Sequence, residues 1–344
     1  MSTSDKPMGK KRALLIAVRH VRGIPEQHTT GLVNLPWAHR DAKNLKDRLI
    51  ASHGYEAEDV ILMLDNKDHE KYLWPTYKNI LEQMDRLVRD ALEDSQFFFY
   101  YSGHALQEHC PDAEEADGQD EEIVAADGKP ILDDLLHIRL IGPLETVKGS
   151  KLFALFDCCH SETLLDLQQG NGPNTYSKEW TVDIGQVFKA VATAIVHLMR
   201  LSKKHCKRVQ YCPPIPREGG SLSDTLTSDT DLKNVASVKV GEEAQNLSVI
   251  CLSACRDHQY AHDDDERKMT FTKYFLKAIV DGAGSNMSWE ELRNELKGGV
   301  EEVRAHYQEY NKKIGEEPSS LINWTQEPKY STTPHTDLTK KVDF

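Results

Sequence analysis

The chain has 344 residues, of which 39% are hydrophobic and 28% charged, close to the composition of an ordinary folded protein. It carries 42 Lys and Arg against 55 Asp and Glu, and this net charge of −13 argues against nucleic-acid binding, which needs a basic face. The longest apolar stretches fall well short of a bilayer span, and the seven cysteines lack the spacing of a disulfide framework. We therefore expect a cytoplasmic protein that binds neither nucleic acid nor membrane.

Short apolar runs alternate with helical patterns along the chain. Strands are predicted over residues 12–20, 60–64, 97–101, 152–156 and 247–252, and helices over 41–52, 76–92, 187–201, 269–280 and from 288 to about 310. Strands that are apolar on every residue are buried on both faces, as in parallel sheets covered by helices. The predicted fold class is α/β, with a mostly parallel central sheet flanked by helices.

Two stretches differ from this pattern in charge. Residues 111–127 hold eight Asp and Glu and no Lys or Arg, whereas residues 200–217 hold six basic residues and no acidic one. From there to about residue 245 the chain is rich in Ser, Thr, Asp and Gly, so we interpret residues 200–245 as an exposed, mobile linker. Cys206 and Cys212 near His205 have the wrong spacing for a zinc site.

Two of the predicted strands end in reactive residues. One runs into Ser102-Gly103-His104 and the other into Asp157-Cys158-Cys159. Sites in open parallel sheets lie beyond the carboxyl ends of the strands, so neighbouring strands would bring His104 beside one of the two cysteines. A single buried Cys or His is more often structural, but the joint placement favours an imidazole that activates a thiol nucleophile.

The motifs at these strand ends resemble those of the metacaspases. YYSGHA and LFDCCHSETLLDL are similar to the family's His and Cys motifs, usually Y-S-G-H-G and D-S-C-H-S-G. Five further stretches of the chain resemble other segments of the family and occur in the same order: LPWAHRDAKNL, DGQDEEIVAAD, ILDDLL, VICLSACRDHQ and QEPKYS. Over about residues 12–331 the chain thus looks like a type I metacaspase without a prodomain, which implies a caspase-haemoglobinase fold and a monomer.

The resemblance also implies roles for individual residues. Cys159 matches the family's nucleophile and His104 its base, and the acid-lined pocket for the residue before the cut bond matches Asp41, Ser102 and Asp157. Two carboxylates in one concave site prefer a guanidinium or ammonium group, so the expected substrates are polypeptides cut after Arg or Lys. The family's calcium ligands match Asp120, Asp133, Asp134 and Asp166, with Asp117 as a substitute for Asp120, and such oxygen ligands suit calcium.

The resemblance divides the chain around the linker. It implies a short extension (1–11), a large-subunit-like catalytic part (12–199), the linker (200–245), a small-subunit-like part (246–331) and a frayed tail (332–344). An active site that prefers Arg or Lys should cut the tethered basic linker first, so the chain is expected to be its own substrate. The alternative is a caspase-like pseudoenzyme that binds basic peptides or partner proteins, favoured by Ala105 and Glu162, which stand where the family has glycine.

Overall fold

The computed structural model describes residues 9–22, 34–66, 72–109, 119–165, 247–262, 267–281, 287–314 and 325–344, except 258 and 335, together with residues 32 and 167. Its centre is a six-stranded sheet in the order β2-β1-β3-β7-β8-β9. These strands are β1 (Lys11–Ala17), β2 (Val60–Leu64), β3 (Gln96–Ser102), β7 (Lys151–Asp157), β8 (Ser248–Ser253) and β9 (Lys329–Thr332). All neighbours are parallel except β8 and β9.

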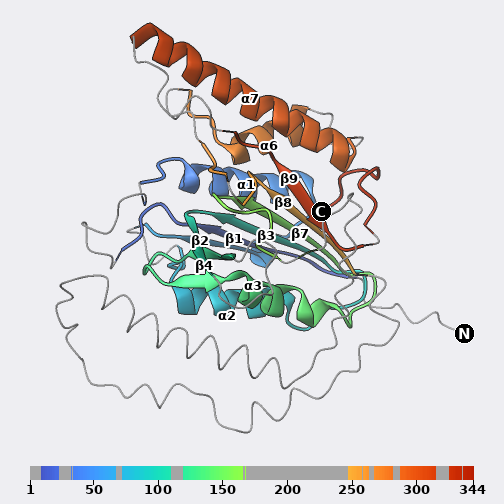
Figure 1. The fold of residues 1–344 in the computed structure, drawn as a ribbon. Coiled ribbons are helices and arrows are strands. Elements are labelled where there is room, and N and C mark those ends of the chain that lie inside the picture. Colours follow the sequence, from blue (N-terminus) through green and yellow to red (C-terminus); the bar gives the residue numbers. More distant parts are fainter. Residues whose placement is uncertain are drawn as a thin grey trace, which may run out of the picture. The chain divides into compact units, whose positions relative to one another are not determined.

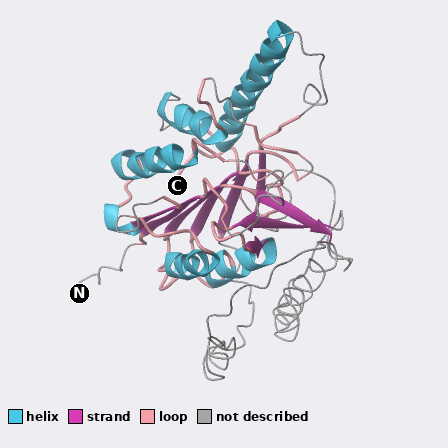
Figure 2. Cartoon of the chain, turned by 90° about the vertical axis from the view of Figure 1, so that its left-hand side faces the viewer, coloured by secondary structure: helices cyan, strands magenta, loops and turns pink. Residues whose placement is uncertain are grey.

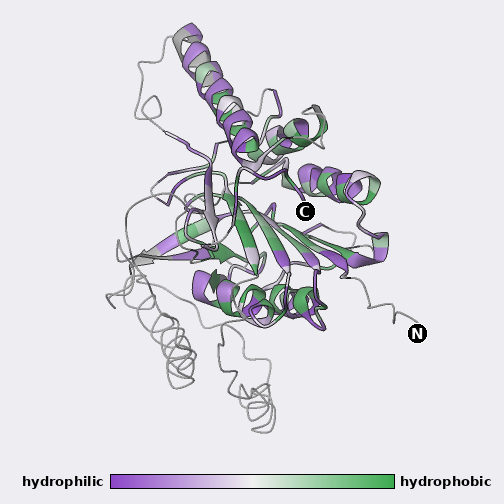
Figure 3. Ribbon diagram, turned by 90° about the vertical axis from the view of Figure 1, so that its right-hand side faces the viewer, coloured by the Kyte–Doolittle hydropathy of each residue, from purple (hydrophilic) through white to green (hydrophobic). Residues whose placement is uncertain are grey.

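The apolar runs fold as the sequence predicts. In β1, β3 and β7 almost every residue is buried, because helices cover both faces of the sheet. One face packs against α1 (Ala38–Ser52), α6 (Phe271–Asp281) and α7 (Trp289–Ile314), and the other against α2 (Tyr77–Val88) and α3 (Asp133–Leu140). Figures 1 and 2 show these two helical layers above and below the sheet. Figure 3 shows the hydrophobic residues gathered on the strands and on the inner sides of the helices. The predicted α/β fold class is confirmed.

Side-chain caps begin two of these helices where the sequence places them. The Thr76 hydroxyl accepts a hydrogen bond from the amide of Asn79 at the start of α2. At α7 the Glu291 amide donates to the Ser288 hydroxyl (3.2 Å), and the Ser288 amide donates to the Glu291 carboxylate (2.7 Å). This reciprocal pair is the capping box that the sequence predicts.

A second, three-stranded antiparallel sheet was not predicted. It consists of β4 (Ala105–His109), β5 (Gln119–Val124) and β6 (Pro130–Leu132). Part of the acidic stretch 111–127 therefore forms a strand, and Glu121 within it is only 1% exposed. Composition concealed this strand because Glu121 is stabilised by tertiary hydrogen bonds, from Gln107 (2.8 Å) and from Thr163 (2.6 Å).

The end of the chain differs from the frayed tail that we expected. Phe344 is 3% exposed and stacks on Phe153 at 5.1 Å, and its backbone carbonyl accepts a hydrogen bond from Lys11. An aromatic side chain buried in the main core stabilises the last residues against fraying.

Several expectations fall on residues that the structure does not describe. The linker 200–245 and the helix predicted over 187–201 both lie outside the described residues. Among the helices that are described, none has both the length and the apolar character needed to cross a membrane.

Candidate active site

The two reactive strand ends lie side by side. β3 and β7 are parallel neighbours in register, and Ser102 pairs directly with Asp157. Because strand residues alternate between faces, Ser102 and Asp157 share the face of Phe98, Tyr100, Phe153 and Leu155, which packs against α1 and α6. His104 and Cys159 each follow two residues later, so both are at the carboxyl edge of the sheet.

The two adjacent cysteines have different surroundings. Cys158 is 2% exposed and belongs to the core cluster on the opposite face of the sheet, under α2 and α3. Burial raises the pKa of the Cys158 thiol well above its ordinary value, and the neighbouring Cys255 raises it further. Cys159 is half-buried. A nucleophile must reach its substrate and ionise, so the geometry favours Cys159 over Cys158.

The turn after Cys159 is held in an unusual backbone conformation. His160 has a φ of 47°, in the left-handed region that non-glycine residues seldom adopt. Its Nδ1 is hydrogen-bonded to the backbone carbonyl of Asp257, and its amide donates to the carbonyl of Gln259 at 3.3 Å. The segment following β8 therefore braces the turn that presents Cys159.

Further contacts in the same place fix Ser161 and Thr163. The Ser161 hydroxyl donates to the carbonyl oxygens of Cys158 (3.1 Å) and Cys255 (3.3 Å), and Ser253 donates to the carbonyl of Ser161. The Thr163 amide donates to the Asp257 carboxylate at 3.1 Å. Residues from both sides of the predicted linker thus build one rigid loop cluster around Cys159.

A buried tyrosine fixes the backbone at His104. The buried Tyr101 hydroxyl lies 2.7 Å from the backbone carbonyl oxygen of His104, and the amide of Val124 donates to that oxygen at 2.9 Å. A Cβ at Gly103 would lie 2.6 Å from Cζ of Tyr101, so only glycine leaves room for this ring. The residue His104 is 9% exposed.

The replacement of glycine by Ala105 causes no backbone strain. Ala105 is the first residue of β4, is 4% exposed, and is not among the residues of positive φ. The chain enters an antiparallel strand directly after His104, so this position does not need the backbone freedom of glycine.

The carboxylates of Asp41 and Asp157 are both buried at the start of α6. Thr270 caps this helix, since its hydroxyl accepts from the amide of Lys273 (3.0 Å), and it donates to Asp41 at 2.6 Å. Two residues further along the chain, the amide and the hydroxyl of Thr272 donate to Oδ2 of Asp157 at 3.0 and 2.6 Å. The Thr272 hydroxyl also lies 2.9 Å from the buried hydroxyl of Tyr100.

Burial disfavours the ionised form of Asp157. The loss of hydrating water raises the pKa of Asp157 from 3.8 to about 6. The hydrogen bonds from Thr272 oppose this shift, and the negative charge of Asp41 adds to it. Asp157 and Asp41 are therefore near enough to repel each other, and a cation placed between them would relieve both.

A cation of the chain itself already contacts Asp41. The Arg40 guanidinium donates through Nε to Oδ1 of Asp41 (2.8 Å) and through a terminal nitrogen to Oδ2 (3.1 Å). It also lies over the Trp37 ring at 4.7 Å, and the Lys268 ammonium lies over the same ring at 5.4 Å. Asp41 is 1% exposed.

The residues matched to a calcium site are described only in part. Both carboxylate oxygens of Asp133 accept backbone amide hydrogens, from Glu121 (3.3 Å) and Asp134 (2.7 Å), whereas Asp134 is exposed. Asp166, Asp117 and the side chain of Asp120 lie outside the described residues. No three His, Cys, Asp or Glu side chains form a metal-binding group in the described part of the chain, so its side chains do not by themselves make a calcium site.

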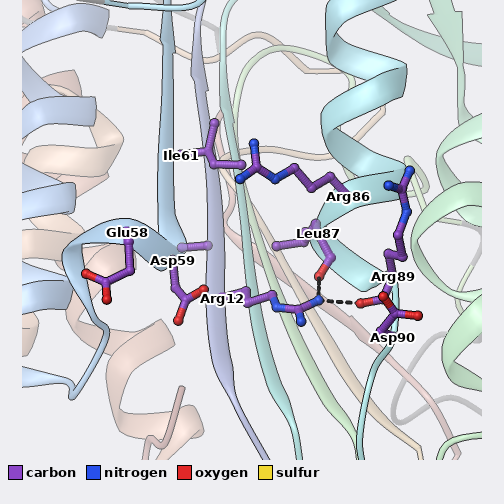
Figure 4. A pocket seen from close by; sticks show the side chains of 9 residues that line it. Arg12, Glu58, Asp59, Ile61, Arg86, Leu87, Arg89 and Asp90 are labelled. Carbon is purple, nitrogen blue, oxygen red and sulfur yellow. Dashed lines mark hydrogen bonds between the residues drawn. The ribbon is translucent and has the colours of Figure 1, made fainter.

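A separate pocket lies at the amino-terminal ends of the strands, beside the start of β1. Figure 4 shows its lining residues, with Arg12 reaching the end of α2. It holds about 270 Å³, and its Arg12 guanidinium donates to the carbonyl oxygens of Leu87 (3.3 Å) and Arg89. Arg12 thus caps the carboxyl end of α2, a structural role, and this pocket is distant from His104 and Cys159.

Sequence reasoning missed Arg40, Thr270 and Thr272. Thr270 and Thr272 both lie in the first turn of the helix predicted over residues 269–280, and only Thr270 caps it. Their bonds to Asp41 and Asp157, 229 and 115 residues away in the chain, depend on the tertiary fold. No sequence signal distinguishes the contact between the adjacent Arg40 and Asp41 from an ordinary pair of surface charges.

Comparison with known proteins agrees with the geometry. Residues 11–168 match the sequence profile of the metacaspase, peptidase C14 domain. The chain is 30% identical over 261 residues to metacaspase-1 of Schizosaccharomyces pombe (74% of this chain, 56% of the relative). It is 33% identical over 278 residues to metacaspase-1 of Saccharomyces cerevisiae (79% and 60%), and 35% identical over 264 residues to that of Kluyveromyces lactis (75% and 55%). The match thus spans little more than half the length of these relatives.

Solved structures support the same fold. A crystal structure of a Geobacter sulfurreducens protein aligns with a TM-score of 0.51 at 19% identity, covering 96% of this chain and 97% of that one. The mostly parallel sheet, with reactive residues at neighbouring carboxyl ends, defines the caspase-like class of proteins. Within that class, residues 11–168 match the metacaspase domain, and the chain is related to the metacaspases named above.

Proposed function

We propose that the protein is a cysteine endopeptidase in which Cys159 is the nucleophile and His104 the general base. The observation that carries this proposal is the in-register pairing of β3 with β7, which is followed on both strands by the reactive residues. His104 takes the thiol proton while the sulfur of Cys159 attacks the substrate carbonyl. The amide N–H of Cys159 and one beside His104 donate to the oxyanion that forms.

The remaining steps release the two products and regenerate the free thiol. The tetrahedral intermediate collapses to a thioester on Cys159, and the protonated His104 gives its proton to the departing amine. Water, activated by neutral His104, then attacks the thioester and releases the acid product and the thiol. The braced turn at His160 keeps Cys159 in one position throughout, so little reorganisation is needed.

The pocket at Asp41, Ser102 and Asp157 is proposed to bind the Arg or Lys side chain that precedes the cut bond. Two mutually repelling, buried carboxylates support this, because a cation compensates their charge. An Asp side chain there would add a third negative charge, so caspase-like cleavage after Asp is disfavoured.

Turnover of a fluorogenic peptide ending in Arg tests the proposal. The intact protein should release the fluorophore and the Cys159→Ala variant should not, whereas a matched peptide ending in Asp should stay uncut. Binding of the Arg peptide by both proteins, with cleavage by neither, would instead support the alternative of a pseudoenzyme that binds basic segments.

Calcium control is a separate proposal that rests on the family resemblance. Asp120, Asp133, Asp134 and Asp166 would hold the ion through oxygen atoms, and the bound charge would compensate their mutual repulsion. Activity measured with millimolar calcium and with chelator tests it, and equal rates in both would contradict it.

Autoprocessing in the basic linker is likewise proposed. A tethered segment reaches the site at a high effective concentration, and the linker offers six basic residues: Arg200, Lys203, Lys204, Lys207, Arg208 and Arg217. Mass spectrometry of the chain after incubation should show new termini behind some of them, and none in Cys159→Ala. Cuts mainly after Asp would contradict the proposed specificity.

A further inference from the structure

The contact between Arg40 and Asp41 is unusual for its position in the fold. Adjacent residues on a helix point in different directions and do not normally face each other. Arg40 nevertheless turns across the first turn of α1 and holds both oxygens of the Asp41 carboxylate. The side chain of Arg40 is 28% exposed and that of Asp41 is 1% exposed, so the cation covers the acid on its solvent side.

The lone pairs of Asp41 are largely used by these contacts. Its Oδ1 accepts from Arg40, and its Oδ2 accepts from both Arg40 and Thr270. A carboxylate offers about four acceptor positions, so a second guanidinium could not form a two-pronged contact with Asp41 while Arg40 is in place. Among the residues that the structure describes, in contrast, both hydrogen bonds to Asp157 end on Oδ2 and leave Oδ1 for a ligand.

We propose that Arg40 is a specificity-determining residue, a resident guanidinium that occupies the Asp41 side of the pocket and competes with the cation of the substrate. This inference rests on the proposed cation-binding role of that pocket. A buried carboxylate without a partner is costly, so Arg40 serves as the counter-ion of Asp41 until a substrate side chain replaces it. Trp37 supports Arg40 in this position, since the guanidinium lies over its ring.

Displacement of Arg40 is feasible because the pair is not fully buried. A partly exposed ion pair has a small net stability, and Arg40 has solvent on one side into which it can swing. A substrate Arg that displaces it gains contacts to Asp41 in addition to the free oxygen of Asp157. Every Arg or Lys ligand therefore binds more weakly than it would to the same pocket without Arg40.

The test measures binding rather than turnover. In the full chain carrying Cys159→Ala, the affinity for N-acetyl-arginine amide is measured by calorimetry with three further variants: Arg40→Gln, Arg40→Lys and Arg48→Gln. Arg48 is the matched control, because it is on the same helix and contacts Ser52 rather than Asp41. N-acetyl-citrulline amide, a neutral analogue of the same shape, is the control ligand.

We expect Arg40→Gln to bind the arginine amide about two- to fivefold more tightly than the parent, the ratio that corresponds to a weak, partly exposed ion pair. Arg40→Lys, which keeps the charge but loses the fork, should fall between them. Arg48→Gln should match the parent, and the citrulline amide should gain nothing in any variant. The arginine amide should also raise the melting temperature of Arg40→Gln more than that of the parent, so a destabilised variant remains informative.

Equal or weaker arginine-amide binding by both Arg40 variants would overturn the role of Arg40, as would an equal gain in Arg48→Gln. Absence of arginine-amide binding by every variant would overturn this role and the proposed cation pocket together. If peptidase activity alone is missing from the protein with Cys159 intact, the binding result still stands and only the catalytic proposal fails.

Discussion

Asp157 should lower the stability of the folded protein above pH 6, and the change Asp157→Asn should recover that stability. Burial raises the pKa of Asp157 to about 6, whereas in the unfolded chain the carboxyl has its ordinary value of 3.8. The folded state therefore keeps this proton while the unfolded state releases it. For a carboxyl with a raised pKa, the favourable contribution is complete below about pH 4 and is lost as the pH rises through 6.

The size of the effect follows from the two pKa values. Each tenfold change in proton affinity is worth 1.36 kcal/mol, so a shift from 3.8 to about 6 costs about 3 kcal/mol in full. At pH 4 the unfolded carboxyl is already partly ionised, so the advantage of Asp157→Asn should be about 2 kcal/mol larger at pH 8 than at pH 4. The Asn carbonyl can still accept both hydrogen bonds from Thr272, which keeps the local structure intact.

Urea unfolding at pH 4 and pH 8 measures this difference directly. Asp47→Asn, an exposed change on α1, is the control and should show nearly the same stability difference at both values. The Asp157→Asn protein should at the same time lose cleavage after Arg and Lys. An equal effect of Asp157→Asn on stability at both pH values would refute the reasoning, because the ionised carboxylate would then cost nothing.

The remaining predictions concern catalysis and positioning. Cys158→Ala should keep most of the peptidase activity, because its side chain points into the core under α2 and α3; a dead variant that still folds would contradict this in a turnover assay. Gly103→Ala should lower stability by about 1–3 kcal/mol and reduce activity, because its Cβ would displace Tyr101, while Gly298→Ala in open space should not. Thr272→Val removes a hydrogen bond that lowers the pKa of Asp157, so the acidic limb of the pH–rate profile for Arg substrates should move to higher pH. An unchanged acidic limb would contradict a role of ionised Asp157 in substrate binding.

Local sequence was sufficient for the elements that hold the reactive residues. The apolar runs that became β3 and β7 needed no partner information, because strands buried on both faces are apolar on nearly every residue. The rule that sites lie at carboxyl ends then places His104 near Cys159. The structure adds the register, which pairs Ser102 with Asp157 and assigns Cys158 to the other face.

The parts that sequence could not predict depend on contacts between distant residues. Glu121 is buried in a strand because Gln107 and Thr163 donate to it, and composition alone made its surroundings look like a solvated loop. Phe344 is held by aromatic partners from other parts of the chain. In the same way, the role of Arg40 follows from the direction in which its side chain turns, which periodicity does not specify.

Covalent labelling tests most directly that Cys159 is a nucleophile activated by His104 in a pocket for cations. The full chain is treated with a peptidyl-arginyl chloromethyl ketone, and the modified cysteine is located by mass spectrometry. The account predicts one adduct on Cys159, formed much more slowly in His104→Ala and slowed by excess arginine amide. Labelling of Cys158, or equal labelling of Cys159 with and without His104, would contradict it.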